Sequence, residues 1–127
     1  MFYSQGIMQY GPGMRAAVLV DKDISRYYKW WIPKWYYPQP QLYPPHITVV
    51  RGRLELSSNI NNWMKYQGYK IPFVYDSTVF YDGTYFYLKV WSEFIGMVRE
   101  ELGLPKYRFN DIERECYHIT IANTKGN

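Results

Sequence analysis

Apolar and polar residues alternate along two short segments of this chain, and each segment begins with a histidine. The first reads HITV from His46 to Val49, the second reads HITI from His118 to Ile121, and together they hold both histidines of the sequence. Strict alternation is typical of a half-buried strand, in which residues two apart share one face. We therefore predict strands over 46–51 and 117–123, each with its His and Thr side by side.

The rest of the pattern predicts helices and further strands. Residues 1–13, which end in Gly-Pro-Gly, are expected to form an irregular arm. Apolar residues at positions 24, 27, 28 and 31 have helical spacing and predict a helix that begins at Asp21 or Asp23 and ends at Pro33. The other predicted elements are a buried strand over 14–20, a short helix over 61–67, strands over 72–81 and 84–91 around an Asp82-Gly83 turn, and a helix from Ser92 to Leu102.

A second regularity relates the two halves of the chain. An apolar-Pro-Lys-aromatic tetrapeptide precedes each His strand, with Pro33 thirteen residues before His46 and Pro105 thirteen before His118. With a strand, a helix and a strand predicted in each half, this repeat indicates a weak internal duplication. We expect a single α+β domain over 1–127, in which two β-α-β halves form lobes related by a pseudo-two-fold axis across a central cleft.

The composition is that of a globular chain of one-domain size, with 127 residues, 47% hydrophobic and 20% charged. No apolar run is long enough for a transmembrane helix or a signal-peptide core, so no membrane association is expected. The single cysteine, Cys116, excludes an intramolecular disulfide and favours a reducing compartment such as the cytoplasm. We interpret it as a buried thiol, and we expect a monomer. The net charge of +4 permits an anionic partner without requiring one.

Aromatic residues are unusually frequent, with five Trp, fifteen Tyr and six Phe. A core of this size does not bury so many rings, so some are expected on the surface, where rings stack on nucleic-acid bases. The segment from Trp30 to Tyr37 interleaves aromatic residues with Lys34. It is a candidate base-stacking platform, and equally a cover for the proline-rich loop that follows.

An imidazole beside a hydroxyl, present twice, is suited to moving two protons at one phosphorus centre. A neutral His takes a proton from the attacking hydroxyl, a protonated His gives one to the leaving oxygen, and Thr hydroxyls donate to the other phosphate oxygens. The candidate catalytic residues are therefore His46, Thr48, His118 and Thr120. This chemistry needs no metal and no other cofactor.

Other roles for the two histidines are less favoured. A lone His in such a strand is more often a structural residue with backbone partners, but repetition of the whole four-residue pattern favours a function. A zinc site would need a further ligand, and neither motif offers an i+4 partner or a nearby carboxylate. A Ser-His-Asp triad would leave one of two matched histidines without a role.

Candidate substrate-binding residues surround the two motifs. Tyr117, Trp91 and Trp35 are candidates for stacking on a base, and Arg51 and Lys125 for contact with a phosphate. Strand alternation directs Arg51 and Lys125 away from the catalytic face, unless Gly52 or the strand end breaks the alternation. The same alternation continues the two catalytic faces to small residues, Gly52 in the first strand and Ala122 in the second, which would leave room for a substrate.

The paired motifs, 72 residues apart in a small α+β chain, resemble those of the two-histidine (2H) phosphoesterase superfamily. The resemblance is best in the second half, from Phe86 through the helix over 92–102 to the second motif, and the first half matches through 14–20 and 46–48. It implies a bilobal α+β fold, hydrolase activity on nucleotides, and the four motif residues as catalytic. The compact length resembles that of short viral members, which include the phage anti-CBASS nucleases that destroy cyclic oligonucleotide signals.

We therefore expect a metal-independent phosphodiesterase that cleaves cyclic or 2′,5′-linked oligonucleotides, and that degrades nucleotide immune signals in the host cytoplasm if the chain is viral. One alternative is a 2′,3′-cyclic phosphodiesterase or RNA end-processing enzyme, which would use the same four residues with water as nucleophile. The other is a non-catalytic module that binds single-stranded nucleic acid through its aromatic residues and lysines.

Overall fold

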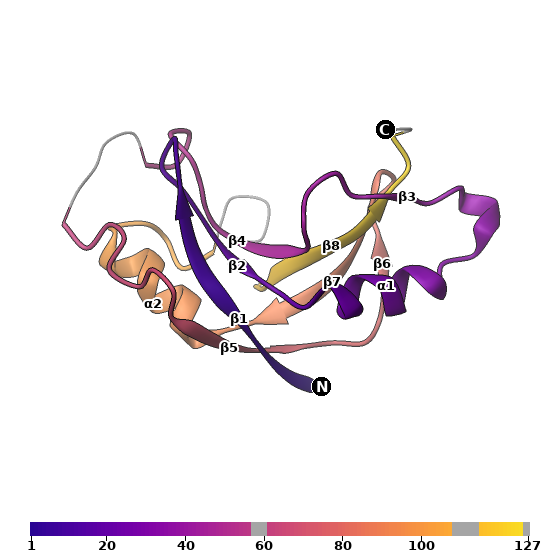
Figure 1. Ribbon diagram of the computed structural model, residues 1–127, viewed down its shortest axis with the longest axis horizontal. Helices are drawn as coiled ribbons and strands as arrows, with labels where there is room; N and C mark the ends of the chain where they lie inside the picture. Colours follow the sequence, from indigo (N-terminus) through magenta and orange to yellow (C-terminus); the bar gives the residue numbers. More distant parts are fainter. Residues whose placement is uncertain (57–60, 108–114, 126–127) are drawn as a thin grey trace.

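The computed structural model describes residues 1–56, 61–107 and 115–125 of the chain. Figure 1 shows the elements along the sequence. They are β1 (Phe2–Gly11), β2 (Arg15–Leu19), α1 (Lys22–Trp30), the 3-10 helix η1 (Lys34–Tyr36), β3 (Gln39–Pro40), β4 (His46–Arg51), β5 (Lys70–Tyr75), β6 (Phe80–Tyr81), β7 (Tyr85–Trp91), α2 (Glu93–Glu101) and β8 (Tyr117–Asn123).

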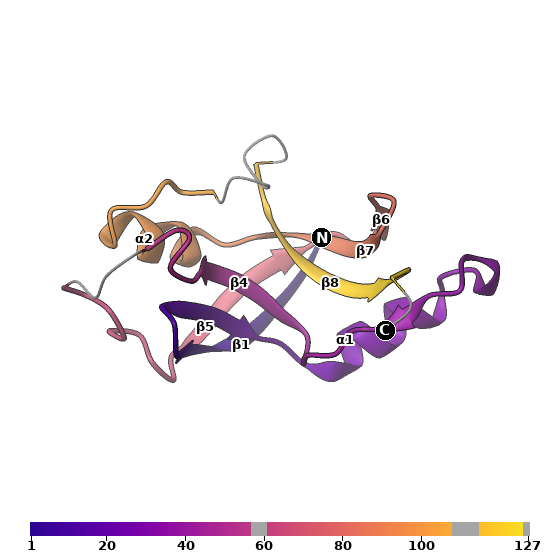
Figure 2. The same ribbon diagram turned by 90° about the horizontal axis from the view of Figure 1, so that it is seen from above.

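The strands form one antiparallel sheet with the order β3-β8-β4-β2-β1-β5-β7-β6. β8 also pairs with β7, so β8, β4, β2, β1, β5 and β7 close into a six-stranded barrel. The two helices, α1 and α2, lie at opposite ends of the long axis of the molecule (Figure 1, Figure 2). The α+β class is thus confirmed. No helix in the described part of the chain has the length and apolar character needed to cross a membrane.

The two His strands pair with each other, through Ile47 on β4 and Ile119 on β8. This pairing joins the two halves of the chain, since β4 follows β2 and α1 whereas β8 follows β7 and α2. Each half thus has a helix between two strands that are antiparallel neighbours. The predicted pair of lobes across a central cleft is wrong, however. Strands of both halves share one closed sheet, in which the backbone groups at the edge of each half find partners in the other.

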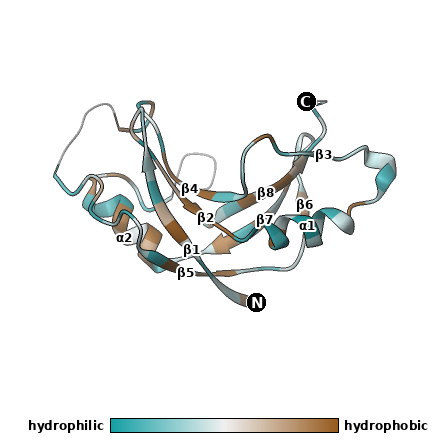
Figure 3. Ribbon diagram, in the orientation of Figure 1, coloured by the Kyte–Doolittle hydropathy of each residue, from teal (hydrophilic) through white to brown (hydrophobic). Residues whose placement is uncertain are grey.

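The apolar residues of the two motifs fill the inside of the barrel. Ile47, Val49, Ile119 and Ile121 are fully buried, and burial of such a side chain stabilises the fold by about 1.5–3 kcal/mol. Other barrel strands contribute further fully buried side chains, among them Met8, Val18, Ile71, Leu88 and Val90. Figure 3 shows the hydrophobic stretches along these strands. Burial of one face therefore fixes the orientation of both His strands.

Three segments differ from the sequence-based prediction. The predicted strand over 72–81 is divided into β5 and β6, with no strand over 76–79. The N-terminal arm is the long strand β1, because β2 and β5 pair with its two edges and complete its hydrogen bonds. The predicted helix over 61–67 is instead a series of turns. Asn62 and Met64 there adopt φ values of 73° and 64°, which an α-helix does not allow. The predicted Asp82-Gly83 turn is confirmed between β6 and β7, with Gly83 at a φ of 100°.

Both helices begin at the predicted capping residues. The side chains of Asp21 and Ser92 each accept a hydrogen bond from a backbone N–H in the first turn of α1 and α2. The predicted apolar face of α1 is only partly correct. Tyr28 is buried, but Trp31 is 65% exposed. After α1 the chain turns inward at Ile32, which enters the core in place of the tryptophan.

Candidate functional site

The four residues of the His-Thr pairs lie on one face of two adjacent strands. Their apolar neighbours point into the barrel, so His46, Thr48, His118 and Thr120 point outward, and all four are half-buried. Because Ile47 pairs with Ile119, the antiparallel register places His46 opposite Thr120 and Thr48 opposite His118. The two histidines are therefore diagonal neighbours on the outer face of the barrel.

This geometry brings both imidazoles within reach of one small group. Diagonal neighbours on antiparallel strands have Cβ atoms roughly 7–8 Å apart, and directly opposite residues roughly 4.5–5.5 Å apart. The register thus places the two imidazoles on neighbouring strands of one face, each opposite the Thr of the other motif. The two histidines lie side by side on one sheet and not on opposite walls of a cleft.

The ring of His46 is held by the segment that leads into β4. Its Nδ1 lies 2.8 Å from the carbonyl oxygen of Pro44. A carbonyl oxygen only accepts hydrogen bonds, so Nδ1 carries the proton and Nε2 has the lone pair when the ring is neutral. The carbonyl oxygen of Pro45 accepts a hydrogen bond from Val20 at 3.2 Å, which ties this segment to the end of β2. In the neutral ring of His46, Nε2 is thus the nitrogen that can accept a proton.

On its other side, β8 pairs with β7, of whose residues the sequence analysis included only Trp91 in the site. Lys89 is the direct cross-strand partner of His118, and Tyr87 is the partner of Thr120. The rings of Tyr87 and His118 meet edge to face, with centroids 6.0 Å apart. Strand alternation places Tyr87 and Lys89 on one face of β7. The sequence does not show, however, that β7 pairs with β8, so these two residues could not be assigned to the site from the sequence.

A β-bulge follows each motif at the same relative position. The extra residue is Val49 in β4 and Ile121 in β8. An extra residue reverses the alternation of the strand beyond it. Val50 and Ala122 therefore point into the barrel, where both are buried, and Arg51 returns to the outer face, where it is exposed.

The bulges overturn two of the predicted orientations. Arg51 was expected to point away from the catalytic residues and instead shares their face, three residues beyond Thr48. Ala122 was expected on the catalytic face and instead lies in the core. Gly52 is a buried residue of the turn after β4, with a φ of 112°, and does not continue the strand.

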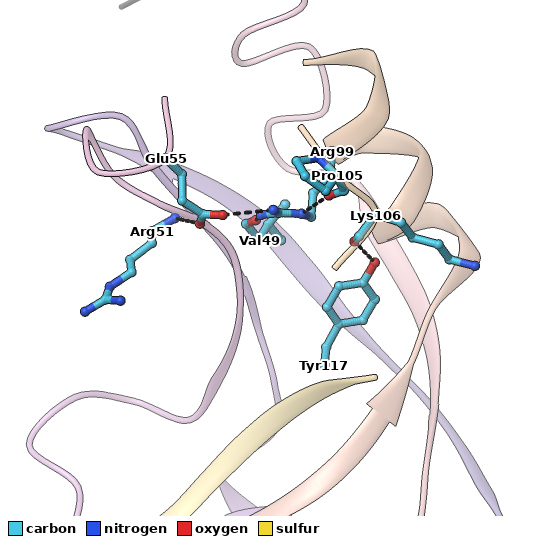
Figure 4. A network of polar contacts seen from close by, with 7 residues as sticks. All are labelled: Val49, Arg51, Glu55, Arg99, Pro105, Lys106 and Tyr117. Atoms are coloured by element: carbon cyan, nitrogen blue, oxygen red, sulfur yellow. Dashed lines mark hydrogen bonds and ion pairs between the residues drawn. The ribbon is translucent and has the colours of Figure 1, made fainter. Parts of the chain in front are cut away.

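Buried Arg99 on α2 holds the bulge of β4 in place (Figure 4). Its guanidinium donates hydrogen bonds to the carbonyl oxygen of Val49 at 2.6 Å and to that of Pro105 at 2.8 Å. It also pairs with Oε2 of Glu55 at 2.8 Å, while Oε1 of Glu55 accepts from the backbone N–H of Arg51 at 2.8 Å. Because Val49 is the extra residue, this network stabilises the irregularity that turns Arg51 outward.

Two of the predicted base-stacking residues line a pocket next to the four motif residues. Tyr117 is buried, and its hydroxyl donates to the carbonyl oxygen of Lys106 at 2.6 Å. Trp91 and Tyr117 together line an open pocket of about 510 Å³ beside the first residue of α2, Glu93. None of the four motif residues lines this pocket. Trp91 and Tyr117 thus share a pocket beside the site, since Tyr117 directly precedes His118 on β8 and Trp91 is two residues beyond Lys89, the cross-strand partner of His118.

The remaining candidates lie on the surface. Nζ of Lys125, just after β8, lies 4.8 Å from the ring centroid of Tyr85. Trp35 is exposed and stacks on Tyr36, with centroids 3.9 Å apart. In the predicted base-stacking platform, Trp30, Trp31, Trp35 and Tyr37 are exposed. Rings for stacking are thus present near α1 and η1.

The side chains that could bind a metal ion and the single cysteine are the other reactive groups of the protein. Among the described residues, no group of three or more His, Cys, Asp and Glu side chains is placed to hold a metal ion. Cys116 is buried, as predicted.

Comparison with known proteins does not assign this chain to a family. No protein-family model matches the sequence, and no curated protein or solved structure is significantly similar to the chain. The residues on the outer face of β4 and β8 are therefore the basis for a proposed function.

Proposed function

We propose that this protein is a metal-independent phosphodiesterase that acts on nucleotides through His46, Thr48, His118 and Thr120. The observation that carries the proposal is the register of β4 and β8, which sets each His opposite the Thr of the other motif on one outward face. Both imidazoles are half-buried on the outer face of the barrel, whereas the apolar residues of the two motifs fill its inside.

In the proposed reaction His46 is the general base and His118 is the general acid. Nε2 of His46 removes a proton from the attacking hydroxyl, whose oxygen forms a bond to phosphorus. His118 in its protonated form gives a proton to the leaving oxygen as the second P–O bond breaks. The hydrogen bond from Nδ1 of His46 to Pro44 supports this assignment, since it leaves the lone pair on Nε2. Exchange with water restores both rings.

Thr48 and Thr120 complete the proposed site. Their hydroxyls donate hydrogen bonds to the non-bridging phosphate oxygens, on which negative charge increases in the transition state. Lys89, directly opposite His118, adds positive charge on the same side of the sheet. This arrangement accepts a ribose 2′-hydroxyl or a water molecule as nucleophile.

Cyclic or 2′,5′-linked oligonucleotides, including those that serve as immune signals, are the proposed substrates, in line with the resemblance to the 2H phosphoesterases. Two features of the chain support that relationship. Each half has a helix between two neighbouring strands, and each motif is followed by a bulge at the same position. The exposed aromatic residues near α1 support a substrate that carries bases.

These exposed rings also favour a second candidate function, a module that binds single-stranded nucleic acid without cleaving it. Trp30, Trp31, Trp35 and Tyr37 are exposed, and Nζ of Lys34 lies 5.8 Å from the ring of Trp30. Such a module would not turn over a substrate, and it would retain most of its affinity after His46→Gln or His118→Gln.

The test is to incubate the protein in EDTA with cyclic di- and trinucleotides, 2′,5′-oligoadenylate and 2′,3′-cyclic mononucleotides, and to identify products by mass spectrometry. We expect cleavage of at least one of these substrates, with a bell-shaped pH dependence because one imidazole must be neutral and the other protonated. Thr48→Ala and Thr120→Ala should each lose less activity than the His variants. Arg26→Gln, on the exposed surface of α1, is the matched control.

Three results would count against the proposal. Full activity of a His46→Ala or His118→Ala variant would remove the assigned roles. Activity abolished by EDTA and restored by zinc or manganese would transfer the chemistry to a metal ion. Binding without any turnover would favour the nucleic-acid-binding module.

A further inference from the structure

Two arginines lie directly opposite each other on the face that carries the His-Thr pairs. Arg15 on β2 is the cross-strand partner of Arg51 on β4, and both are exposed. The bulge at Val49 is the reason that this pair shares the outer face with Thr48 and His46. If the strand alternated regularly through Val49, without a bulge, Arg51 would point into the barrel.

Like charges at directly opposite positions of a sheet destabilise it unless an opposite charge lies between them. In the described part of the chain, no carboxylate forms an ion pair with Arg15 or Arg51. The carboxylate of Glu55 accepts hydrogen bonds from the backbone N–H of Arg51 and from the guanidinium of Arg99. Figure 4 shows the guanidinium of Arg51 directed away from Glu55. The pair is thus arranged to bind an anion from outside.

We propose that Arg15 and Arg51 bind a second phosphate of the substrate, next to the phosphate that is cleaved. The inference rests on the proposed function and makes it more specific. The preferred substrate carries at least two phosphates, as an oligonucleotide does, and a 2′,3′-cyclic mononucleotide is a poor substrate.

Geometry separates this second phosphate from the one between the histidines. Thr48 and Arg51 lie opposite Ala17 and Arg15, which are two residues apart on β2. An extended strand rises about 3.3 Å per residue, so the arginine pair begins roughly 7 Å from Thr48. Arg15 extends further away, because its side chain lies across Gly52. A Cβ at Gly52 would be 3.4 Å from Cγ of Arg15 and 3.7 Å from its Nε. The absence of a side chain at Gly52 therefore leaves the space that Arg15 occupies.

The network below the pair fixes the position of Arg51. Its backbone N–H is held by Glu55, and Glu55 is held by buried Arg99, which also binds the carbonyl oxygen of Val49. The backbone of Arg51 is thus constrained before a ligand arrives, and only its side chain must become ordered on binding. Glu55 and Arg99 are positioning residues for this site.

The experiment compares two ligands that differ in the number of phosphates, the dinucleotide ApA with one and the trinucleotide ApApA with two, each in the 3′,5′ and 2′,5′ linkage. Dissociation constants are measured by calorimetry in the His118→Ala background, in which turnover is slowed about 10²–10⁴-fold. Arg15→Gln and Arg51→Gln are tested, and Arg26→Gln, exposed on α1, is the matched control. We expect ApApA to bind about ten-fold more tightly than ApA, because a charge-assisted contact is added.

Arg15→Gln or Arg51→Gln should bring this ratio of dissociation constants close to one, whereas Arg26→Gln should preserve it. The dependence of ApApA binding on salt should also weaken, by a slope of about 0.7 for each lost phosphate contact. A ratio that survives both substitutions, or an equal loss for ApA and ApApA, would overturn the inference. If the ratio behaves as expected but none of the substrates is cleaved, the phosphate site stands and the proposed enzymatic function fails.

Discussion

Replacement of Arg99 by methionine is expected to destabilise the protein strongly. Methionine has a similar length and keeps most of the apolar contacts of the arginine stem, but it donates no hydrogen bond. The change removes the donors to the carbonyl oxygens of Val49 and Pro105, and it removes the buried cation beside Glu55.

The structure sets the magnitude of this effect. The side chain of Arg99 is 1% exposed and that of Glu55 is 17% exposed, so little solvent replaces the lost partners. Removal of one member of a buried ion pair typically costs about 3–5 kcal/mol, and we expect a loss in this range in the free energy of unfolding. Since a domain of this size has a total stability of about 5–15 kcal/mol, a fraction of the variant is expected to be unfolded at 37 °C.

Urea unfolding followed by tryptophan fluorescence and circular dichroism measures this loss. Arg26→Met is the control, because Arg26 forms an exposed ion pair with Asp23 and should change stability by less than about 1 kcal/mol. The double variant Arg99→Met/Glu55→Leu should recover part of the loss, since it no longer buries a carboxylate without its cation. A loss below about 1 kcal/mol in Arg99→Met would refute the role given to this network.

Three further predictions concern catalysis, acid stability and packing. His46→Ala and His118→Ala should each slow cleavage about 10²–10⁴-fold, and the double variant should be little slower than the slower single one; additive losses would contradict a joint role. The hydrogen bond from Tyr66, at 2.5 Å, lowers the pKa of Glu101 below its usual value. Its contribution to stability is therefore present above the unfolded-state pKa and lost as the pH falls through the folded-state pKa, so Glu101→Gln should weaken the pH dependence of urea unfolding in acid; an unchanged dependence would contradict this. Gly6→Ala should lower the free energy of unfolding by about 1–3 kcal/mol, because a Cβ at this position overlaps the backbone of the neighbouring strand β2. At Gly11 a Cβ meets nothing within 4 Å, so Gly11→Ala should change the free energy of unfolding by less than about 0.5 kcal/mol. Equal effects of the two substitutions would contradict this prediction.

The sequence by itself determined the features that depend on neighbours along the chain. Alternation set the faces of the two His strands, because Ile47 and Ile119 had to be buried and their polar neighbours did not. Side-chain capping placed the start of α2 at Ser92, and Asp82-Gly83 placed the turn between β6 and β7. These signals arise from a few adjacent residues, so they can be read before any fold is known.

Only the tertiary structure decided which segments lie beside each other. The sequence analysis did not predict strand β1, because its local sequence has no clear strand pattern. The strand forms because β2 and β5 pair with its two edges. The halves were expected as separate lobes, but closure of the sheet paired β4 with β8. The diagonal placement of His46 and His118 comes from that register, which no local pattern encodes.

Arg51 illustrates the same limit at a single residue. Regular alternation would direct its side chain inward, but the bulge at Val49 reverses the alternation of faces beyond it. Arg99, fifty residues from Val49 in the sequence, stabilises this bulge through a hydrogen bond. A bulge is stabilised by partners elsewhere in the fold, so the period of the strand does not predict it. The sequence thus determined which residues the two motifs present to a substrate, and the closed sheet decided how those residues meet and which arginines stand beside them.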